Sequence, residues 1–158
     1  TDRISLWLVS AAGDQHIVAA DVLGSPSVGV WYTCTGTHDS VLNATSLRVN
    51  GGAADTGSLT FGVREGTADF RVGSGHSALW HLDGILDWAG LWKGRVLDAT
   101  DHGLLVNGGA SQEFTGLNAG LLTLMESWWD FDDAASPSID KDGANDLAWV
   151  NGPTPVLL

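Results

Sequence analysis

The chain has 158 residues, enough for one domain that buries roughly 68–70% of its unfolded surface. Hydrophobic residues make up 44% of it, which excludes a disordered chain, and nineteen acidic against seven basic residues give a formal net charge of −12. This charge argues against nucleic-acid and anionic-membrane partners, because both require clusters of Lys and Arg. It suits a solubilising surface, a divalent cation site or a sugar-binding face.

Cysteine content and hydropathy set two further limits. Cys34 is the only cysteine, so an intrachain disulfide is excluded, and we expect it to be a small buried side chain. The chain has no signal peptide and no apolar run long enough to span a bilayer, so we expect it to be soluble. It begins inside a strand-like pattern, which predicts a mature or excised fragment.

Short apolar and polar alternations separated by turn signals predict an all-β chain. In residues 4–9, Ile4, Leu6 and Leu8 alternate with Arg3, Ser5 and Trp7. Further strands are predicted at residues 16–23, 28–34, 40–49, 58–64 and 68–72. Turn signals at a spacing of about 8–12 residues are typical of a β-sandwich. With no internal repeat and no linker, a single domain over residues 1–158 is expected.

Residues 83–109 are the most informative stretch. Apolar side chains occupy both parities from residue 85 to residue 92, which predicts a strand covered on both faces. A short helix is predicted near residues 98–107. Asp98 is the expected N-cap, with Asp101 three residues later, and Asn107 with the two glycines after it supplies the stop.

Two blocks of sequence resemble laminin G-like domains of the concanavalin A-like lectin and glucanase superfamily. Gly-Ile-x-Asp, a strand, an acidic short helix and Asn-Gly-Gly, within residues 84–109, are similar to the closing strand and helix of that family. Ser-Trp-Trp-Asp-Phe-Asp-Asp at residues 127–133, followed by Asp-Lys-Asp-Gly-Ala-Asn-Asp-Leu at residues 140–147, resembles the opening of its bacterial and phage repeats. Trp88 and Asp133 stand where the family usually has Glu.

The resemblance implies a two-sheet antiparallel jelly-roll sandwich and an extracellular, cell-surface or virion location. The order of the blocks differs from the family, because the opening segment lies at the C-terminal end. Three accounts fit this order: a circularly permuted domain, one unit of a tandem array, or a C-terminal segment, residues 124–158, that complements a neighbouring copy. A sandwich that lacks an edge strand exposes unpaired backbone groups, and a strand from another copy can pair with them. If each copy donates its strand to the next and the series does not close into a ring, the product is a filament.

An acidic loop at residues 140–146 is a candidate calcium site. Oxygen ligands recur at alternate positions around Gly143, as in loops that wrap this ion, although the bidentate Glu of an EF-hand is missing. The alternative is a turn held by side-chain-to-backbone hydrogen bonds. The expected metal ligands are Asp133, Asp140, Asp142, Asn145 and Asp146.

Eight Trp residues are many for this length, and an exposed Trp can stack on a sugar ring. The candidate glycan contacts are Trp92, Trp128, Trp149, Asp83 and Asp87. The two aspartates lie four residues apart, hence on one face of the predicted strand. The Trp residues expected in the core are Trp7, Trp80, Trp88 and Trp129.

No catalytic residue is predicted. The five histidines lack zinc-ligand spacing, and the Glu-x-Asp-x-x-Glu signature of laminarinase-type glycosidases is absent. A retaining glycosidase needs two carboxyl groups about 5–5.5 Å apart, and the sequence offers no such pair. Asn43-Ala-Thr45 matches the N-glycosylation sequon.

Together these features predict a non-catalytic extracellular or virion-surface module. We expect it to assemble with copies of itself as a homo-oligomer or polymer, with glycan as a candidate ligand. One alternative is a monomeric carbohydrate-binding, lectin-like domain. The other, less favoured, is a laminarinase-type hydrolase that uses Asp83 and Asp87. Nucleic-acid binding and membrane insertion are not expected.

Overall fold

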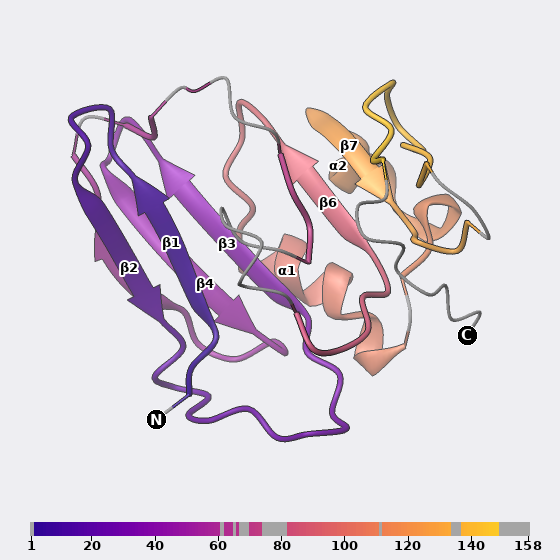
Figure 1. The fold of residues 1–158 in the computed structure, drawn as a ribbon, viewed down its shortest axis with the longest axis horizontal. Coiled ribbons are helices and arrows are strands. Elements are labelled where there is room, and N and C mark those ends of the chain that lie inside the picture. Colours follow the sequence, from indigo (N-terminus) through magenta and orange to yellow (C-terminus); the bar gives the residue numbers. More distant parts are fainter. Residues whose placement is uncertain are drawn as a thin grey trace. The chain divides into compact units, whose positions relative to one another are not determined.

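The structure is a computed structural model that describes residues 2–60, 62–64, 66, 70–73, 82–110, 112–133 and 137–148. These residues form mainly short strands in small antiparallel sheets, with little helix, which confirms the strand-rich character predicted from the sequence (Figure 1). The elements in chain order are β1 (Ser5–Val9), β2 (Gln15–Ala19), β3 (Cys34–Asp39), β4 (Ala44–Val49), β5 (Asp55–Ser58), β6 (Ala89–Trp92), α1 (Ala99–Val106), η1 (Asn107–Gly109), η2 (Phe114–Gly116), α2 (Ala119–Leu122) and β7 (Met125–Trp129).

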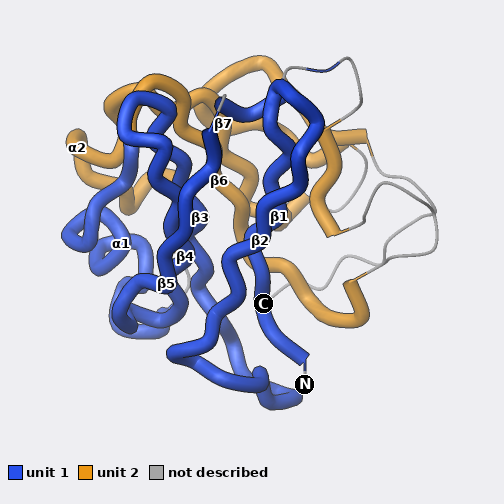
Figure 2. Tube along the Cα trace, turned by 90° about the vertical axis from the view of Figure 1, so that its left-hand side faces the viewer, with its two compact units in different colours: residues 1–67, 96–110 blue, residues 68–95, 111–158 orange. Residues whose placement is uncertain are grey.

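The chain divides into two compact units, and it passes between them more than once. The first unit comprises residues 1–67 and 96–110, and the second comprises residues 68–95 and 111–158 (Figure 2). The expectation of a single domain over residues 1–158 stays a prediction. Of the helices in the described part of the chain, none has the length and apolar character needed to cross a membrane.

The first unit is built from a hairpin and a three-stranded sheet. β1 and β2 pair as an antiparallel hairpin, and β3, β4 and β5 form an antiparallel sheet in that order. Apolar residues from both meet in one core, because β2 lies against β4 and β5. The core consists of Val18, Ala20, Leu47 and Val49, with Ile4, Leu6, Leu23 and Tyr32 packed against it.

Helix α1 belongs to the first unit and begins and ends where its local sequence predicts. The carboxylate of Asp98 accepts hydrogen bonds from the backbone N–H groups of Thr100 and Asp101, at 2.7 and 2.9 Å. The Asp101 carboxylate accepts one in return from the Asp98 N–H, at 3.1 Å, which completes a capping box. Asn107 ends the helix in the left-handed conformation, with φ of 47°. The predicted helix and both of its caps are confirmed.

The second unit has a two-stranded sheet with short helical turns beside it in the chain. β6 and β7 pair antiparallel, with Gly90 opposite Trp128. Four of the five β7 residues are buried, and Glu126 is the exposed one. Among the described residues of this unit, the buried apolar side chains are those of Leu117, Leu121, Met125, Trp128 and Trp129.

Several predicted strands are wrong in their bounds. Residues 28–33 form a loop instead of a strand, exposed at residues 28–31, since Gly29 adopts a positive φ of 76° and no partner strand pairs with this run among the described residues. Residues 85–88 are not strand either, so the strand predicted over residues 85–92 shortens to β6. Residues 40–43 are a turn, and beyond β5 the segment near Val63 makes only an isolated bridge to Ser10. Of the strand predicted at residues 68–72, residues 70–72 are not strand, and the others lie outside the described residues.

Candidate functional site

The acidic loop of residues 137–148 is closed and pinned to β7. Ser138 and Leu147 exchange backbone hydrogen bonds of 2.9 Å in both directions. Lys141 donates its backbone N–H to the carbonyl oxygen of Trp128, at 2.7 Å. These backbone hydrogen bonds close the loop and join it to β7.

Asp140 is the central side chain of this loop and is only 5% exposed. Its Oδ1 accepts the backbone N–H of Trp128 at 2.9 Å and that of Asp142 at 3.2 Å. Its Oδ2 accepts the backbone N–H of Asn145 at 3.1 Å. A Cβ atom added at Gly143 would lie 2.8 Å from Oδ2, so the loop needs glycine there. One carboxylate thus joins the loop to β7.

Burial alone would raise the pKa of the Asp140 carboxyl, but hydrogen bonds outweigh it. The backbone N–H of Trp128, the Ser127 hydroxyl and the N–H groups of Asn145 and Gly143 stabilise the ionised form. The net effect lowers the pKa of Asp140 below its ordinary value. The carboxylate is therefore charged at neutral pH, and its charge is balanced by aligned donors.

Of the other predicted metal ligands, Asp142, Asn145 and Asp146 lie in this loop, and Asp133 precedes it in the chain. Asp133 accepts the Ile139 N–H at 2.8 Å and lies 3.6 Å from the Lys141 ammonium. Asp146 accepts the N–H of Asp140 at 3.0 Å. The Asn145 amide donates to the Ser127 hydroxyl at 2.8 Å, and Asp142 is exposed. These side chains are brought together, but most of them serve the loop itself.

Calcium binding stays a prediction. Within the ranges that the structure describes, no three His, Cys, Asp or Glu side chains are grouped so as to hold a metal ion. The hydrogen bonds favour the alternative weighed from the sequence, a turn that its own side chains stabilise.

Trp128 is fully buried, at 0% exposure, so its assignment as a glycan contact is wrong. Trp88 stacks on it with ring centroids 4.6 Å apart, and Trp92 meets it edge-on at 6.2 Å. Its indole N–H donates to Asp130. Gly90 makes this possible, because a Cβ atom there would lie 2.7 Å from the Trp128 ring.

The remaining predicted ligand contacts are half-buried, in non-strand backbone or outside the described residues. Trp92 is half-buried, and its indole N–H donates to the carbonyl oxygen of Leu121 at 2.6 Å. Asp83 and Asp87 precede β6 in non-strand backbone, so the prediction that a strand aligns them on one face is wrong. Trp149 lies outside the described residues, as does Trp80.

One exposed apolar surface that includes a Trp lies on the β1–β2 hairpin of the first unit. Trp7 is 59% exposed, which makes its expected place in the core wrong, and it faces Ile17 across the hairpin. Val9 and Gln15 form the next exposed pair on the same side. We call these four residues the outer face. The alternation of Leu6 and Leu8 with Trp7 was the signal that could have located it.

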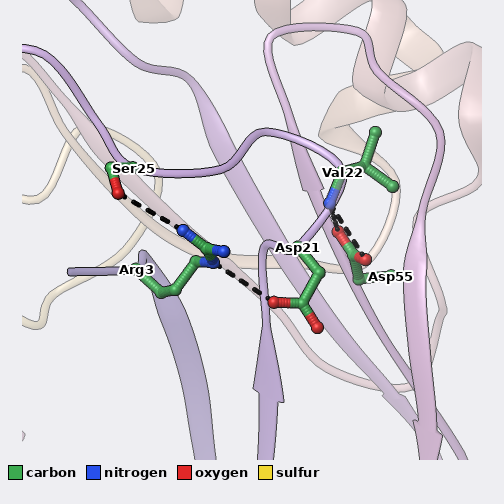
Figure 3. A network of polar contacts seen from close by, with 5 residues as sticks. All are labelled: Arg3, Asp21, Val22, Ser25 and Asp55. Carbon is green, nitrogen blue, oxygen red and sulfur yellow. Dashed lines mark hydrogen bonds and ion pairs between the residues drawn. The ribbon is translucent and has the colours of Figure 1, made fainter. Parts of the chain in front are cut away.

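A polar network holds the long loop between β2 and β3 (Figure 3). Arg3 donates to Asp21 at 3.2 Å and to the Ser25 hydroxyl at 3.3 Å, and the Asp55 carboxylate accepts the Val22 N–H at 3.3 Å. This loop presents further exposed apolar side chains, which are Val22, Val28, Val30 and Trp31.

Two smaller predictions concern the first unit as well. Cys34 is exposed, so its expected burial is wrong: it is the first residue of β3 and pairs with Val49 at the end of the core face. In the Asn43 sequon, Thr45 is buried and its hydroxyl lies 3.0 Å from the His16 ring.

Comparison with known proteins does not assign this chain to a family: no protein-family model, no curated protein and no solved structure matches it.

Proposed function

We propose that this chain is a non-catalytic binding module that assembles with copies of itself through the outer face. The observation that carries the proposal is the exposed cross-strand pair of Trp7 and Ile17. Large apolar side chains that stand side by side on a strand surface are costly to leave in water. Burying one stabilises a contact by about 1.5–3 kcal/mol.

The hairpin context supports a second copy as the occupant. We expect the copies to meet face to face and not edge to edge, because an edge contact needs unpaired backbone groups and those at the end of β1 are already paired. The end of β1 is covered by residues 62–64, where Arg64 donates its N–H to the Val9 carbonyl oxygen at 2.7 Å. Two outer faces brought together would bury Trp7 and Ile17 from both copies in an isologous contact.

Charge favours an apolar contact over an ionic one. Each copy carries a net charge of −12, so two copies repel one another, and the apolar contact must offset that repulsion. Added salt screens the repulsion and leaves the apolar contact intact. Self-association is therefore expected to strengthen as salt is raised, which is opposite to the behaviour of an ionic interface.

The finer fold and setting are part of the same proposal. A laminin G-like, jelly-roll sandwich is supported by the hairpin that packs on the three-stranded sheet around a common core. An extracellular or virion-surface location, calcium in the acidic loop and strand donation by residues 124–158 accompany it. In the structure β7 pairs with β6 of its own chain, so donation requires that pair to open.

The experiment is sedimentation velocity on the wild type and two serine variants. Trp7→Ser removes the largest side chain of the outer face, and we expect it to shift the protein to monomer. Val28→Ser removes an exposed apolar side chain outside that face and serves as the control. Equal association by all three proteins would show that the outer face is not the contact.

Glycan binding is a second candidate function, favoured by the position of Gln15 beside Trp7. Gln15 is diagonal to Trp7 on the same side of the hairpin, so an indole face and an amide lie within reach of one sugar unit. Screening on a glycan array, with Trp7→Ala and Trp31→Ala compared, tests it. We expect Trp7→Ala to abolish a hit that Trp31→Ala retains, and the reverse pattern contradicts a site on this face.

A further inference from the structure

His102 connects α1 to two other elements of the first unit. The ring is 1% exposed and lies between β3 and the turn that follows β4. Its Nδ1 lies 2.6 Å from the hydroxyl oxygen of Thr35, and its Nε2 lies 2.9 Å from the backbone nitrogen of Gly51. The ring therefore fastens residues 96–110 to a sheet formed by a distant part of the sequence.

The Gly51 contact determines which nitrogen carries the proton. A backbone N–H can only donate, so Nε2 must accept and is unprotonated. The single proton of the neutral ring then resides on Nδ1 and is donated to the Thr35 hydroxyl oxygen. Both ring nitrogens are used, and the Gly51 contact requires an unprotonated Nε2 and therefore the neutral ring.

The charges on the elements around the ring oppose a second proton. Arg48 on β4 is the cation that acts on His102. Asp39 is at the far end of β3, four residues from Thr35, and its carboxylate accepts the N–H groups of the turn at Val41 and Leu42. It is thus engaged elsewhere.

The acids of α1 itself are engaged as well. Asp98 and Asp101 bind each other's backbone N–H groups in the capping box at the start of the helix. Burial, and after it the Arg48 charge, lower the pKa of His102 below its ordinary value.

We propose that His102 is an acid-sensitive latch that holds residues 96–110 on the sheet of the first unit. A proton added at Nε2 would point at the Gly51 N–H. Two donors cannot form a hydrogen bond, so the contact that holds residues 96–110 would be lost. The protonated ring would also be a buried cation beside Arg48. Acid therefore releases α1 from β3 and from the turn after β4, while the hairpin core has no part in this contact.

The sign of the pH effect follows from the lowered pKa. The unfolded chain binds a proton at His102 near its ordinary pKa of about 6.5, before the folded chain does. The contribution of the latch is complete above that pH. It is lost as pH falls from there toward the lower pKa of the folded state.

The test is hydrogen exchange of the backbone amides, corrected for intrinsic rates, from about pH 7.5 to about pH 5. In the wild type we expect selective loss of protection in α1 over this range. His102→Gln cannot be protonated, so its α1 protection is expected to be independent of pH. His16→Gln is the matched control, since it alters a histidine of the same unit and is expected to keep the wild-type pH response.

A pH-independent α1 in the wild type, or the same pH response in His102→Gln, would overturn the latch. A second measurement needs no variant. The ¹⁵N spectrum of the wild-type imidazole at neutral pH is expected to show the neutral ring protonated on Nδ1. A ring protonated on Nε2, or a charged ring, would contradict the proposal even if His102→Gln fails to fold.

Discussion

Asp140 shows how one buried carboxylate can organise a loop. It accepts N–H groups from β7 and from both sides of its own turn. Each hydrogen bond to a charged group contributes about 1.5–3 kcal/mol to the free energy of unfolding. A buried donor left without an acceptor lowers stability by a similar amount. The loop's conformation therefore depends on this side chain more than on the number of acids around it.

Asp140→Asn should lower the free energy of unfolding by about 1.5–3 kcal/mol at neutral pH, because the amide nitrogen cannot accept the Asn145 N–H. Urea unfolding measures the change. Asp142→Asn alters an exposed acid two residues away and should change stability by less than about 0.5 kcal/mol. Equal losses in the two variants would mean that net charge, not the hydrogen bonds, is responsible.

The stability of the same two variants is also expected to depend differently on pH. The lowered pKa of folded Asp140 means that its contribution is complete above the unfolded value of about 3.9 and is lost as pH falls through the folded value. Wild type and Asp142→Asn should therefore lose stability in acid, whereas Asp140→Asn should lose less. Parallel acid profiles in all three proteins would contradict this account.

At the scale of elements, β6 and β7 are held together by aromatic packing over a glycine. Gly90 faces Trp128, and a Cβ atom there would lie 2.7 Å from that ring and 2.8 Å from the ring of Trp92. Packing this close leaves no space for even one methyl group. The pairing of the two strands thus requires glycine at this position.

Gly90→Ala should destabilise the protein by about 1–3 kcal/mol, since the Trp rings must shift to admit the methyl group. Gly103→Ala is the matched control, because a Cβ atom in α1 at that position meets nothing within 4 Å. It should stabilise the protein by about 0.5–1 kcal/mol through helix propensity. Thermal unfolding compares the two, and a stabilising Gly90→Ala would refute the packing argument.

The elements also show which features can be predicted from one sequence. Helix α1 was predictable because its signals are local: Asp98 caps its start, and Asn107 ends it in a left-handed turn. The acidic loop was recognised as a unit, and the hydrogen bonds of its own side chains fit the alternative of a self-stabilised turn, while calcium binding stays a prediction. Both rest on residues that are close in sequence.

Features that depend on distant partners were missed. The burial of Trp128 depends on Gly90 across the strand pair, and nothing near Trp128 in the sequence reports it. The loop at residues 28–33 carries the apolar pattern of a strand but exposes Val28, Val30 and Trp31, because a run of apolar residues does not show whether a partner strand is present. Trp7 was placed in the core by residue type, although it points to the opposite side of β1 from Leu6, which is half-buried and packs against the core.

At the scale of the whole molecule, self-association must overcome the charge of the chain. A net charge of −12 keeps copies apart, and the outer face provides the apolar contact that is proposed to bring them together. The proposal thus links one exposed pair on a hairpin to the state of the protein in solution. It also separates assembly from the His102 latch, which acts on the other face of the β3–β4–β5 sheet and has its own pH dependence.

The most direct test is the mass of the wild-type protein in solution, measured by light scattering over a series of concentrations at low and high salt. The account predicts oligomers that grow with concentration and are favoured by salt, because screening removes the repulsion and leaves the apolar contact. A monodisperse monomer at the highest concentration and at both salt levels would contradict it.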